Sequence, residues 1–447
     1  MQQRSQFATR LGVIATTVGS AVGLGNIWRF PYEAGMHGGG AFLLIDLFFI
    51  FIIGVPVVCA EFIIGRHTGS NIRGAFRKLA PGSPWGWVSF IGLGASILIL
   101  SFYSVVAGWT MEYTVKSLQG FSGATTPEAL HEQFDTFATS DFGPVVWTLI
   151  FLAANYIILA RGVQKGIEKM SNVLMPMLFV ILLAFTINSL TMTGAAEGLE
   201  FLFKPDFSAI TPTVILSAMG QAFFSLSLGL GCLITYSSYF QATTPLIRTS
   251  LITAALDTLV AVLAGIIIFP AVFTFGQEPT AGPKLVFEVL PSIFTHIAGG
   301  QIWSTLFFFL LFLASITSTI SMAEITIAYF AEEFRMPRRI ATAVTIGLSM
   351  LLGSLCALSF GSLGEFKICG MTLFNLFDFV SSNIFLPIGG MVISLFVGWV
   401  LDRSVVRSEL TAGGPKSGYI MARMVVFSLR WIAPVCIGFV FIFGLIR

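Results

Sequence analysis

Charged residues are scarce in this chain of 447 residues. Asp, Glu, Lys and Arg together make up 10% of it, whereas 55% of the residues are hydrophobic. Soluble domains carry about 25% charged residues, so this composition excludes an ordinary soluble protein. The formal net charge of +2 is also too small to indicate a nucleic-acid partner.

Motifs for catalysis, nucleotide binding and metal clusters are lacking as well. The five cysteines are odd in number and form no C-x-x-C pair, which argues against a disulfide or zinc framework. The four histidines are scattered, and neither G-x-x-x-x-G-K-[ST] nor H-E-x-x-H occurs. We therefore predict that the protein is not an enzyme.

Long apolar segments are what the chain has in abundance. About 20 apolar residues suffice for a helix to cross a bilayer. The sequence predicts an all-α membrane protein with about 11 transmembrane helices, surrounded by the lipid bilayer. The apolar runs are 10–35, 41–64, 89–115, 144–160, 173–190, 213–236, 251–275, 302–330, 340–360, 384–401 and 424–446.

Basic residues gather in alternate loops between these runs. The other loops, such as 119–143 and 191–211, are acidic or neutral. Because cytoplasmic loops carry the excess of Lys and Arg, we expect a cytoplasmic N-terminus and, with an odd number of spans, an external C-terminus. The basic residues include Arg4, Arg10, Arg66, Arg73, Arg77, Lys78, Arg161, Lys165, Lys169, Arg248, Arg335, Arg338, Arg339, Arg403, Arg407, Lys416 and Arg423.

Two glycine-rich stretches interrupt the first and the sixth apolar run. They are Gly19–Gly25 and Ser225–Gly231, and both contain an apolar-Gly-Leu-Gly core. Paired breaks in corresponding halves point to the binding site of a transporter built from inverted repeats. We predict one transporter domain, 1–447, with a first repeat over 1–190 (helices 1–5), a second over 212–401 (helices 6–10) and an extra helix 11 over 423–446.

Unwound backbone is tolerated at membrane depth where it is buried in protein or lines a cavity. Its free carbonyls can hold cations, and the N-terminus of a half-helix offers amides to an anion. The alternative is that these glycines merely allow close helix packing, since Gly19 and Gly23 have the spacing of a small-x-x-x-small motif.

The first break also carries a family resemblance. The run Gly19-Ser-Ala-Val-Gly-Leu-Gly-Asn-Ile-Trp-Arg-Phe-Pro31, preceded by Arg10-Leu-Gly12, resembles the first-helix signature of the neurotransmitter:sodium symporter family, in its bacterial branch. Ser225–Gly231 resembles the sixth helix of that family. The resemblance implies a 5+5 inverted repeat with broken helices 1 and 6, two Na⁺ sites, and a bacterial inner (plasma) membrane.

Two sodium sites follow from this resemblance. All the implied ligands are hard oxygens, which suit a small hard cation. The first site is implied to use Ala21, Asn26, Ser225 and Asp257 together with the substrate carboxylate. The second is implied to use Gly19, Val22, Ala314, Thr317 and Ser318. For the hydroxyl groups, the alternative is ordinary hydrogen bonding between helices.

Asp257 departs from the asparagine that is common in the family. An intramembrane carboxylate is expensive and usually functional, although Asp257 could simply lie near the end of its span. Our hypothesis is that its charge replaces the chloride of chloride-dependent relatives. Ala261, one turn later, offers no hydroxyl for chloride, so no chloride is expected.

The resemblance also implies the substrate contacts. The Tyr103 hydroxyl and the amides of Leu24 and Gly25 would hold the substrate carboxylate. Gly23 stands where monoamine transporters of the family carry aspartate, which implies a substrate that brings its own carboxylate. The amine would meet Ala21, Phe224 and the Ser227 region, with Ser318 nearby. The side-chain pocket would be Ser20, Ile99, Phe224, Leu230, Ser321 and Met322.

Gates and a hinge complete the implied machinery. Arg29 and Asp378 match the external gate, and Arg4 with Glu332 matches the cytoplasmic one, with Phe7 in place of the usual tryptophan. Gly166 and Pro176 match a motif that lets the fifth helix unwind, because proline removes a helix hydrogen bond and glycine adds freedom.

We thus expect a sodium-coupled symporter that imports hydrophobic, aliphatic or aromatic, L-amino acids by alternating access. Two rivals stay open. A proton-coupled amino acid transporter of the same architecture would need a cation in place of the second sodium, which Thr317 and Ser318 oppose. A non-transporting amino acid sensor would bind the same ligand. The oligomeric state cannot be read from the sequence.

Overall fold

Helices account for nearly all the regular structure of the chain. The computed structural model describes residues 6–123, 126–276, 286–287, 290–295, 299–411 and 418–446. Within these ranges no β-strand occurs, and two isolated bridges, Gly39 with Pro205 and Ile368 with Met371, are the sole β contacts. The predicted all-α class is confirmed.

The described residues up to Ser189 form nine α-helices. Thr9 caps the first of them, because its side chain accepts a hydrogen bond from the N–H of Gly12. The helices are α1 (Arg10–Ala21), α2 (Phe30–Met36), α3 (Gly40–Phe49), α4 (Val55–Thr68), α5 (Ile72–Leu79), α6 (Val88–Leu118), α7 (Pro127–Thr139), α8 (Gly143–Leu159) and α9 (Lys169–Ser189).

The second half begins with a short helix and then repeats the pattern of a capped, broken span. Thr211 caps α11 by accepting from the N–H of Val214. The helices are α10 (Ala195–Phe203), α11 (Pro212–Ser225), α12 (Cys232–Ser237), α13 (Leu246–Thr274), α14 (Leu290–Thr295), α15 (Gly300–Glu333), α16 (Arg338–Leu358), α17 (Leu373–Phe379), α18 (Leu386–Leu395), α19 (Arg403–Thr411), α20 (Gly418–Phe427) and α21 (Ala433–Ile446).

Short turns of wider or tighter helix join several of these pieces into longer rods. The wider, π-helical turns are η1 (Gly25–Arg29), η2 (Ile50–Gly54), η5 (Val163–Glu168), η8 (Val380–Phe385), η9 (Phe396–Val400) and η10 (Ser428–Ile432). The tighter 3₁₀ turns are η3 (Pro84–Trp87), η4 (Gly120–Gly123) and η6 (Phe207–Ala209).

Eight rods are long and apolar enough to cross a membrane, and two bent pairs of helices raise the number to ten among the described residues. The first predicted span is one of the bent pairs, and α7 with α8 forms the other. The sixth predicted span is split into α11 and α12, neither of which is long enough by itself. This split accounts for the difference from the eleven segments expected from the sequence.

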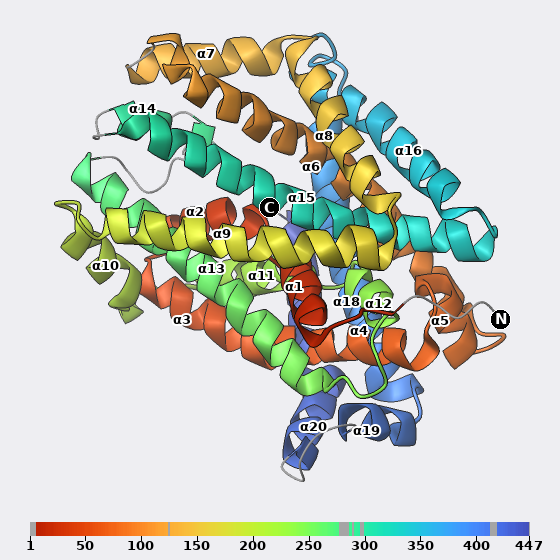
Figure 1. Ribbon diagram of the computed structural model, residues 1–447. Helices are drawn as coiled ribbons and strands as arrows, with labels where there is room; N and C mark the ends of the chain where they lie inside the picture. The colour runs from red at the N-terminus through yellow and green to blue at the C-terminus, as the bar shows by residue number, and fades with distance from the viewer. Residues whose placement is uncertain are drawn as a thin grey trace.

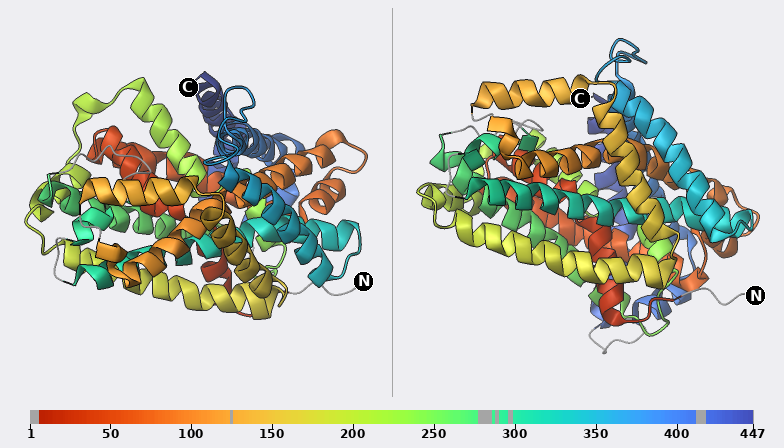
Figure 2. Two further views of the ribbon diagram at one scale, coloured as in Figure 1. Left: turned by 90° about the horizontal axis from the view of Figure 1, so that it is seen from above. Right: turned by 45° about the horizontal axis from the view of Figure 1, so that its top comes forward.

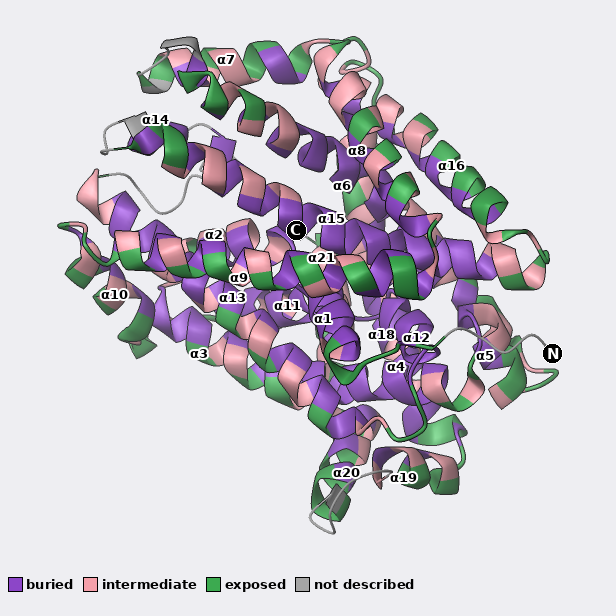
Figure 3. Ribbon diagram, viewed as in Figure 1, coloured by how far each residue is buried: buried purple, intermediate pink, exposed green. Residues whose placement is uncertain are grey.

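The two broken spans occupy the middle of the bundle (Figure 1). Colouring by burial shows α1, α11, α12 and α15 mostly buried, whereas α8, α9 and α16 carry exposed residues along their outer faces (Figure 3). The helix α15 packs against α1, α6, α9 and α12. The breaks are therefore enclosed by protein, as unwound backbone at membrane depth requires.

The helices in the loops separate into two groups. In both views of Figure 2, α10 and α14 lie at one end of the bundle, while α5 lies at the opposite end. Arg73, Arg77 and Lys78 belong to α5 or its end, whereas Glu197 and Glu200 belong to α10. The arrangement agrees with the loop charges that underlie the expected orientation.

Candidate substrate and ion site

The first helix break bends the chain by 54° between α1 and the rod Gly25–Met36. After Ala21 the helix stops, and Val22 has extended backbone with φ −65° and ψ 119°. The second break, between Ser225 and Cys232, contains left-handed backbone at Gly229 (φ 83°) and Gly231 (φ 80°). A Cβ on Gly229 would lie 2.3 Å from the carbonyl oxygen of Leu386, so glycine is required there.

A small cavity lies where the two breaks face each other. It offers about 40 Å³ to the centres of water molecules, which is room for a few waters in this conformation. Its walls come from both breaks, α6, α15 and α18. The lining residues are Ala21, Gly23, Gly25, Ile99, Tyr103, Phe224, Ser225, Ser227, Leu230, Ser318, Met322 and Leu386.

Three predicted ligands of the first sodium site meet beside this cavity. The Asn26 amide nitrogen lies 2.7 Å from Asp257 Oδ1 and 2.9 Å from Ser225 Oγ. Ser225 in turn donates to Asp257 Oδ2 at 2.6 Å. Asp257 is fully buried, and no basic side chain in the described part of the chain forms an ion pair with it.

Ser225 and Asp257 offer oxygens that suit a sodium ion, while Asn26 turns its NH₂ group toward them. A buried carboxylate without a positive partner is unfavourable, so the cluster is suited to a cation. Ser225 and Asp257 supply hard oxygens, and Ala21 lines the same cavity. The Asn26 carbonyl oxygen accepts from the N–H of Gly23 at 3.0 Å, which ties the ligand to the break itself.

The predicted ligands of the second sodium site also come together. Ser318 Oγ donates to the carbonyl of Val22 at 2.9 Å, joining α15 to the first break. Thr317 Oγ1 lies 3.0 Å from the carbonyl of Ala314. A Cβ on Gly19 would lie 3.4 Å from Cβ of Thr317, so all five residues share one contact region. The oxygens of this region suit a hard monovalent cation.

The expected carboxylate-binding groups are adjacent. The N–H of Leu24 donates to the Tyr103 hydroxyl at 2.9 Å. A Cβ on Gly23 would lie 2.9 Å from the same hydroxyl and 2.7 Å from Ser318 Oγ. Any side chain at Gly23 would therefore enter the space next to the donors.

The predicted side-chain pocket is partly reproduced by the cavity wall. Ile99, Phe224, Leu230 and Met322 line it, whereas Ser20 and Ser321 do not. Ser321 Oγ instead donates to the carbonyl of Ser318 at 2.6 Å, within its own helix. Leu386, at the start of α18, lines the cavity and was not expected, because an apolar residue after a π-helical turn carries no distinctive sequence signal.

The expected external gate residues have other partners in this structure. The Arg29 guanidinium lies 4.2 Å from the centre of the Phe224 ring and 3.8 Å from Glu33. Asp378 accepts a hydrogen bond from Ser382 at 2.9 Å. Arg29 and Asp378 therefore do not form a direct ion pair here.

Of the two residues expected in the cytoplasmic gate, one lies among the described residues. Arg4 lies outside the described residues, while Glu332 accepts hydrogen bonds from the backbone and side chain of Asn71 at 2.8 and 2.9 Å. Phe7, which stands in place of tryptophan, is 1% exposed and packs edge-on against Tyr236 and Tyr239. Phe7 is thus packed against the end of the second broken span.

The expected hinge is helical in this conformation. Gly166 lies in η5, which continues into α9 as one rod, Val163–Ser189, with Pro176 inside it. A Cβ on Gly166 would lie 2.2 Å from the carbonyl oxygen of Ile158. Glycine at this position therefore permits a close approach of two backbones in the helical state.

Two buried carboxylates in the second span were missed by sequence reasoning. Glu61 accepts a hydrogen bond from the N–H of Gly229 at 2.9 Å, in the middle of the second break. Asp46 is 3% exposed, and its Oδ1 has no hydrogen-bond partner among the described residues. Their signal was available, because an ionisable residue inside a long apolar run is usually functional.

The chain is similar to known proteins over nearly its whole length. Residues 4–128 and 129–447 match the family described as the Sodium:neurotransmitter symporter family. The chain is 38% identical over 441 residues to the sodium-dependent transporter YhdH of Bacillus subtilis, covering 99% of this chain and 98% of that protein. It is also 38% identical over 422 residues to a sodium-dependent transporter of Haemophilus influenzae, covering 92% of each.

A solved structure has the same fold. The crystal structure of MhsT in complex with L-phenylalanine is similar with a TM-score of 0.90 and 46% sequence identity. The similarity covers 98% of this chain and 99% of that one.

Proposed function

The chain belongs to the sodium:neurotransmitter symporter family, and from that premise we propose that it imports hydrophobic L-amino acids together with sodium. The family consists of sodium-dependent membrane transporters, and we propose no catalytic role for any residue. The proposed substrates carry an aliphatic or aromatic side chain. The proposed stoichiometry is two sodium ions without chloride.

The observation that carries the proposal is the arrangement around Gly23. The Leu24 N–H donates to the Tyr103 hydroxyl there at 2.9 Å, and even a Cβ on Gly23 would lie too close to that hydroxyl and to Ser318 Oγ. A substrate carboxylate would replace this hydrogen bond by accepting from both the amide and the hydroxyl. The complex of MhsT with L-phenylalanine is in keeping with an amino acid substrate.

The nature of the cavity wall supports a hydrophobic side chain. Ile99, Phe224, Leu230 and Met322 are apolar, and methionine adapts to several shapes. The cavity is small in this conformation, so Phe224 and its neighbours must shift outward to admit an aromatic substrate. The contact of Arg29 with the Phe224 ring links that shift to the external face.

The coupling of substrate binding to sodium binding follows from a contact that the two ligands share. A sodium ion at the first site would supply the positive charge that Asp257 and the substrate carboxylate both require. Asn26 and Ser225 hold Asp257 in place, and Ala21 lines the cavity next to them. Because each ligand would improve the site for the other, the two must bind cooperatively and reciprocally.

Gating is proposed to involve both ends of the broken spans. Arg29 with Asp378 would close the external side, and Arg4 with Glu332 the cytoplasmic side. Unwinding of the rod around Gly166 and Pro176 would admit water to the second sodium site from the cytoplasm. We also propose the inverted repeats 1–190 and 212–401, a cytoplasmic N-terminus, an external C-terminus and a bacterial inner (plasma) membrane.

Uptake into proteoliposomes tests the proposed function. Labelled phenylalanine, leucine, tryptophan, tyrosine and alanine are offered with an inward sodium gradient, with potassium in its place, and with gluconate replacing chloride. We expect sodium-driven uptake of the hydrophobic amino acids that persists in gluconate. Uptake driven by a proton gradient without sodium would indicate the proton-coupled rival. Binding without counterflow would indicate a sensor.

A further inference from the structure

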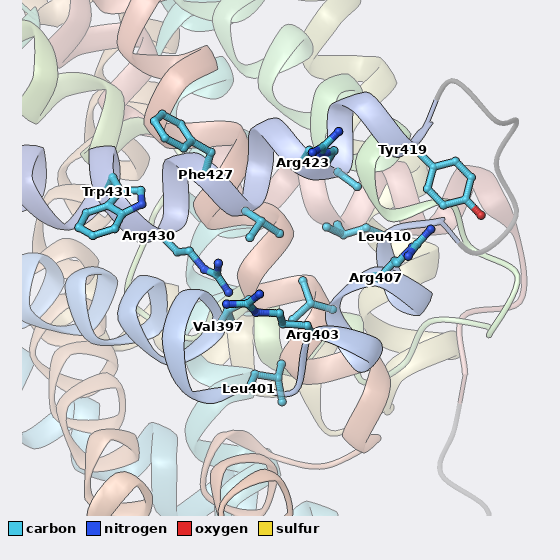
Figure 4. A pocket seen from close by; sticks show the side chains of 13 residues that line it. Val397, Leu401, Arg403, Arg407, Leu410, Tyr419, Arg423, Phe427, Arg430 and Trp431 are labelled. Carbon is cyan, nitrogen blue, oxygen red and sulfur yellow. The ribbon is translucent and has the colours of Figure 1, made fainter.

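A second cavity, far larger than the central one, lies at the end of the bundle that carries α5. It has a volume of about 740 Å³ and lies between the last turn of the tenth span, the helix α19 and the beginning of the eleventh span (Figure 4). The contact of Glu409 in α19 with Arg66 in α4 places this region beside the basic loop after the second span. The transport mechanism makes no use of this cavity.

Four arginines line this pocket, which we call the arginine pocket: Arg403, Arg407, Arg423 and Arg430. Figure 4 shows Arg403 and Arg430 extending from opposite walls toward its middle. None of the four forms an ion pair with a carboxylate among the described residues. The arginine pocket is therefore strongly positive and has guanidinium donors to spare.

The two carboxylates in or beside α19 have other partners. Asp402 accepts hydrogen bonds from the backbone and hydroxyl of Ser404, both at 2.7 Å. Glu409 is held by Arg66 and His67 at 2.6 and 3.1 Å. An anion from outside the chain is thus the natural partner of the arginine pocket, because Arg pairs with phosphate through parallel hydrogen bonds.

The other wall of the arginine pocket is apolar and continues onto the lipid-facing side of the last span. Phe427 and Trp431 line the pocket and are 58% and 55% exposed. Val435 and Phe439 follow at the same four-residue spacing and are 56% and 57% exposed. Residues four apart share one helix face, so an apolar strip runs from the pocket along the span. A ligand that used both walls would be amphipathic.

Aromatic residues mark the depth of the arginine pocket in the membrane. The Trp399 and Trp431 rings meet edge-on, 4.9 Å apart, and the Arg430 guanidinium lies 5.5 Å from the Trp399 ring. Tryptophans concentrate at the boundary between hydrocarbon and headgroups, where basic pockets recognise acidic lipids.

We propose that the arginine pocket binds one anionic phospholipid of the cytoplasmic leaflet. Its phosphate would lie among the four arginines that line the pocket. Its acyl chains would lie on the strip that begins at Phe427 and Trp431. A free phosphate would leave this strip unused, and an uncharged headgroup would leave the arginines without a counter-charge.

Native mass spectrometry of the full chain, released from bilayers of equal phosphatidylglycerol and phosphatidylcholine, tests the proposal. The charge variant is Arg407→Gln with Arg423→Gln. The matched control is Arg335→Gln with Arg339→Gln, which removes two charges from the preceding cytoplasmic loop. We expect bound phosphatidylglycerol to fall on the order of tenfold in the charge variant, since each arginine contributes to attraction at an anionic surface, and to stay unchanged in the control.

The proposal is overturned by any of three results. These are equal retention of the two lipids by the unmodified protein, undiminished phosphatidylglycerol in the charge variant, and complete displacement of the lipid by excess inorganic phosphate, which would assign the site to a free anion. A lipid-free dimer that the charge variant dissociates would assign the pocket to a second copy instead. If the double variant does not fold, the exposed Arg407 is replaced alone, and the same outcomes apply.

Discussion

Glu61 in α4 accepts a hydrogen bond from the N–H of Gly229, 2.9 Å away, in the middle of the second helix break. Its second carboxylate oxygen, Oε2, is buried and has no hydrogen-bond partner among the described residues. The fully buried Glu61 thereby supplies an acceptor for an amide that a continuous helix would have satisfied internally. The second span therefore stabilises the broken form of the sixth span.

Removing this acceptor is expected to destabilise the protein. Glu61→Ala leaves a buried amide unpaired, which costs about 1–3 kcal/mol. Glu61→Gln keeps an acceptor oxygen and is expected to cost less. Thermal unfolding in detergent measures both, with the exposed Glu197→Ala as the control. Equal melting temperatures for Glu61→Ala and the control would contradict this role.

Asp257 is expected to control the affinity for sodium. Asp257→Asn removes the one charge of the cluster with Asn26 and Ser225, and losing a charge partner in a buried site costs about 3–5 kcal/mol. We expect the sodium concentration for half-maximal uptake to rise at least about tenfold, which corresponds to 1.4 kcal/mol. Asp206→Asn, on the surface, is the control. An unchanged sodium dependence would remove Asp257 from the site.

Gly23 is expected to tolerate no side chain. In Gly23→Ala the Cβ would lie 2.7 Å from Ser318 Oγ and 2.9 Å from the Tyr103 hydroxyl, where the substrate carboxylate is proposed to bind. We expect amino acid binding to be lost while the protein still folds. Gly220→Ala is the matched control, because a Cβ there meets nothing within 4 Å. Scintillation proximity binding of labelled phenylalanine compares the two, and similar affinities would argue against the assignment.

Substitutions of Pro176 and Gly166 in the fifth span are expected to have opposite effects on the release of sodium. Pro176→Ala restores a helix hydrogen bond and should slow the release of sodium to the cytoplasm. Gly166→Ala forces a Cβ to within 2.2 Å of the Ile158 carbonyl in the helical state and should favour unwinding. Efflux from preloaded proteoliposomes measures the release, with Gly347→Ala as the control. If both variants released sodium at the unmodified rate, the hinge would have to lie elsewhere.

The apolar runs were a strong basis for predicting the spans. Each expected run coincides with a helix or a broken pair, because hydrocarbon forces the backbone to satisfy its hydrogen bonds within a helix. The two helix breaks could be predicted as well as the spans, since glycine permits the left-handed backbone found at Gly229 and Gly231. The number of spans found in the described residues is one below the eleven expected, because the break between Ser225 and Cys232 leaves pieces too short to be recognised as a span.

Part of the substrate and ion site could be predicted from the sequence. Asn26, Ser225 and Asp257 were assigned to the first sodium site through the family signature, and the structure brings them within 2.9 Å of one another. Leu386 and Glu61 were not, because their contacts depend on how α18 and α4 pack against the second break. The Arg29 and Asp378 pairing depends on conformation, and in this one each side chain has another partner.

Hydropathy and glycine content act locally, and for that reason the sequence was enough to establish the membrane class, the positions of the spans and the places where two of them break. Packing between distant segments established the rest: which oxygens face each other across the breaks, how small the enclosed cavity is, and that four arginines from α19 and the eleventh span line one pocket beside an apolar strip. Such contacts join residues up to hundreds of positions apart, such as Val22 with Ser318, and no local pattern encodes them.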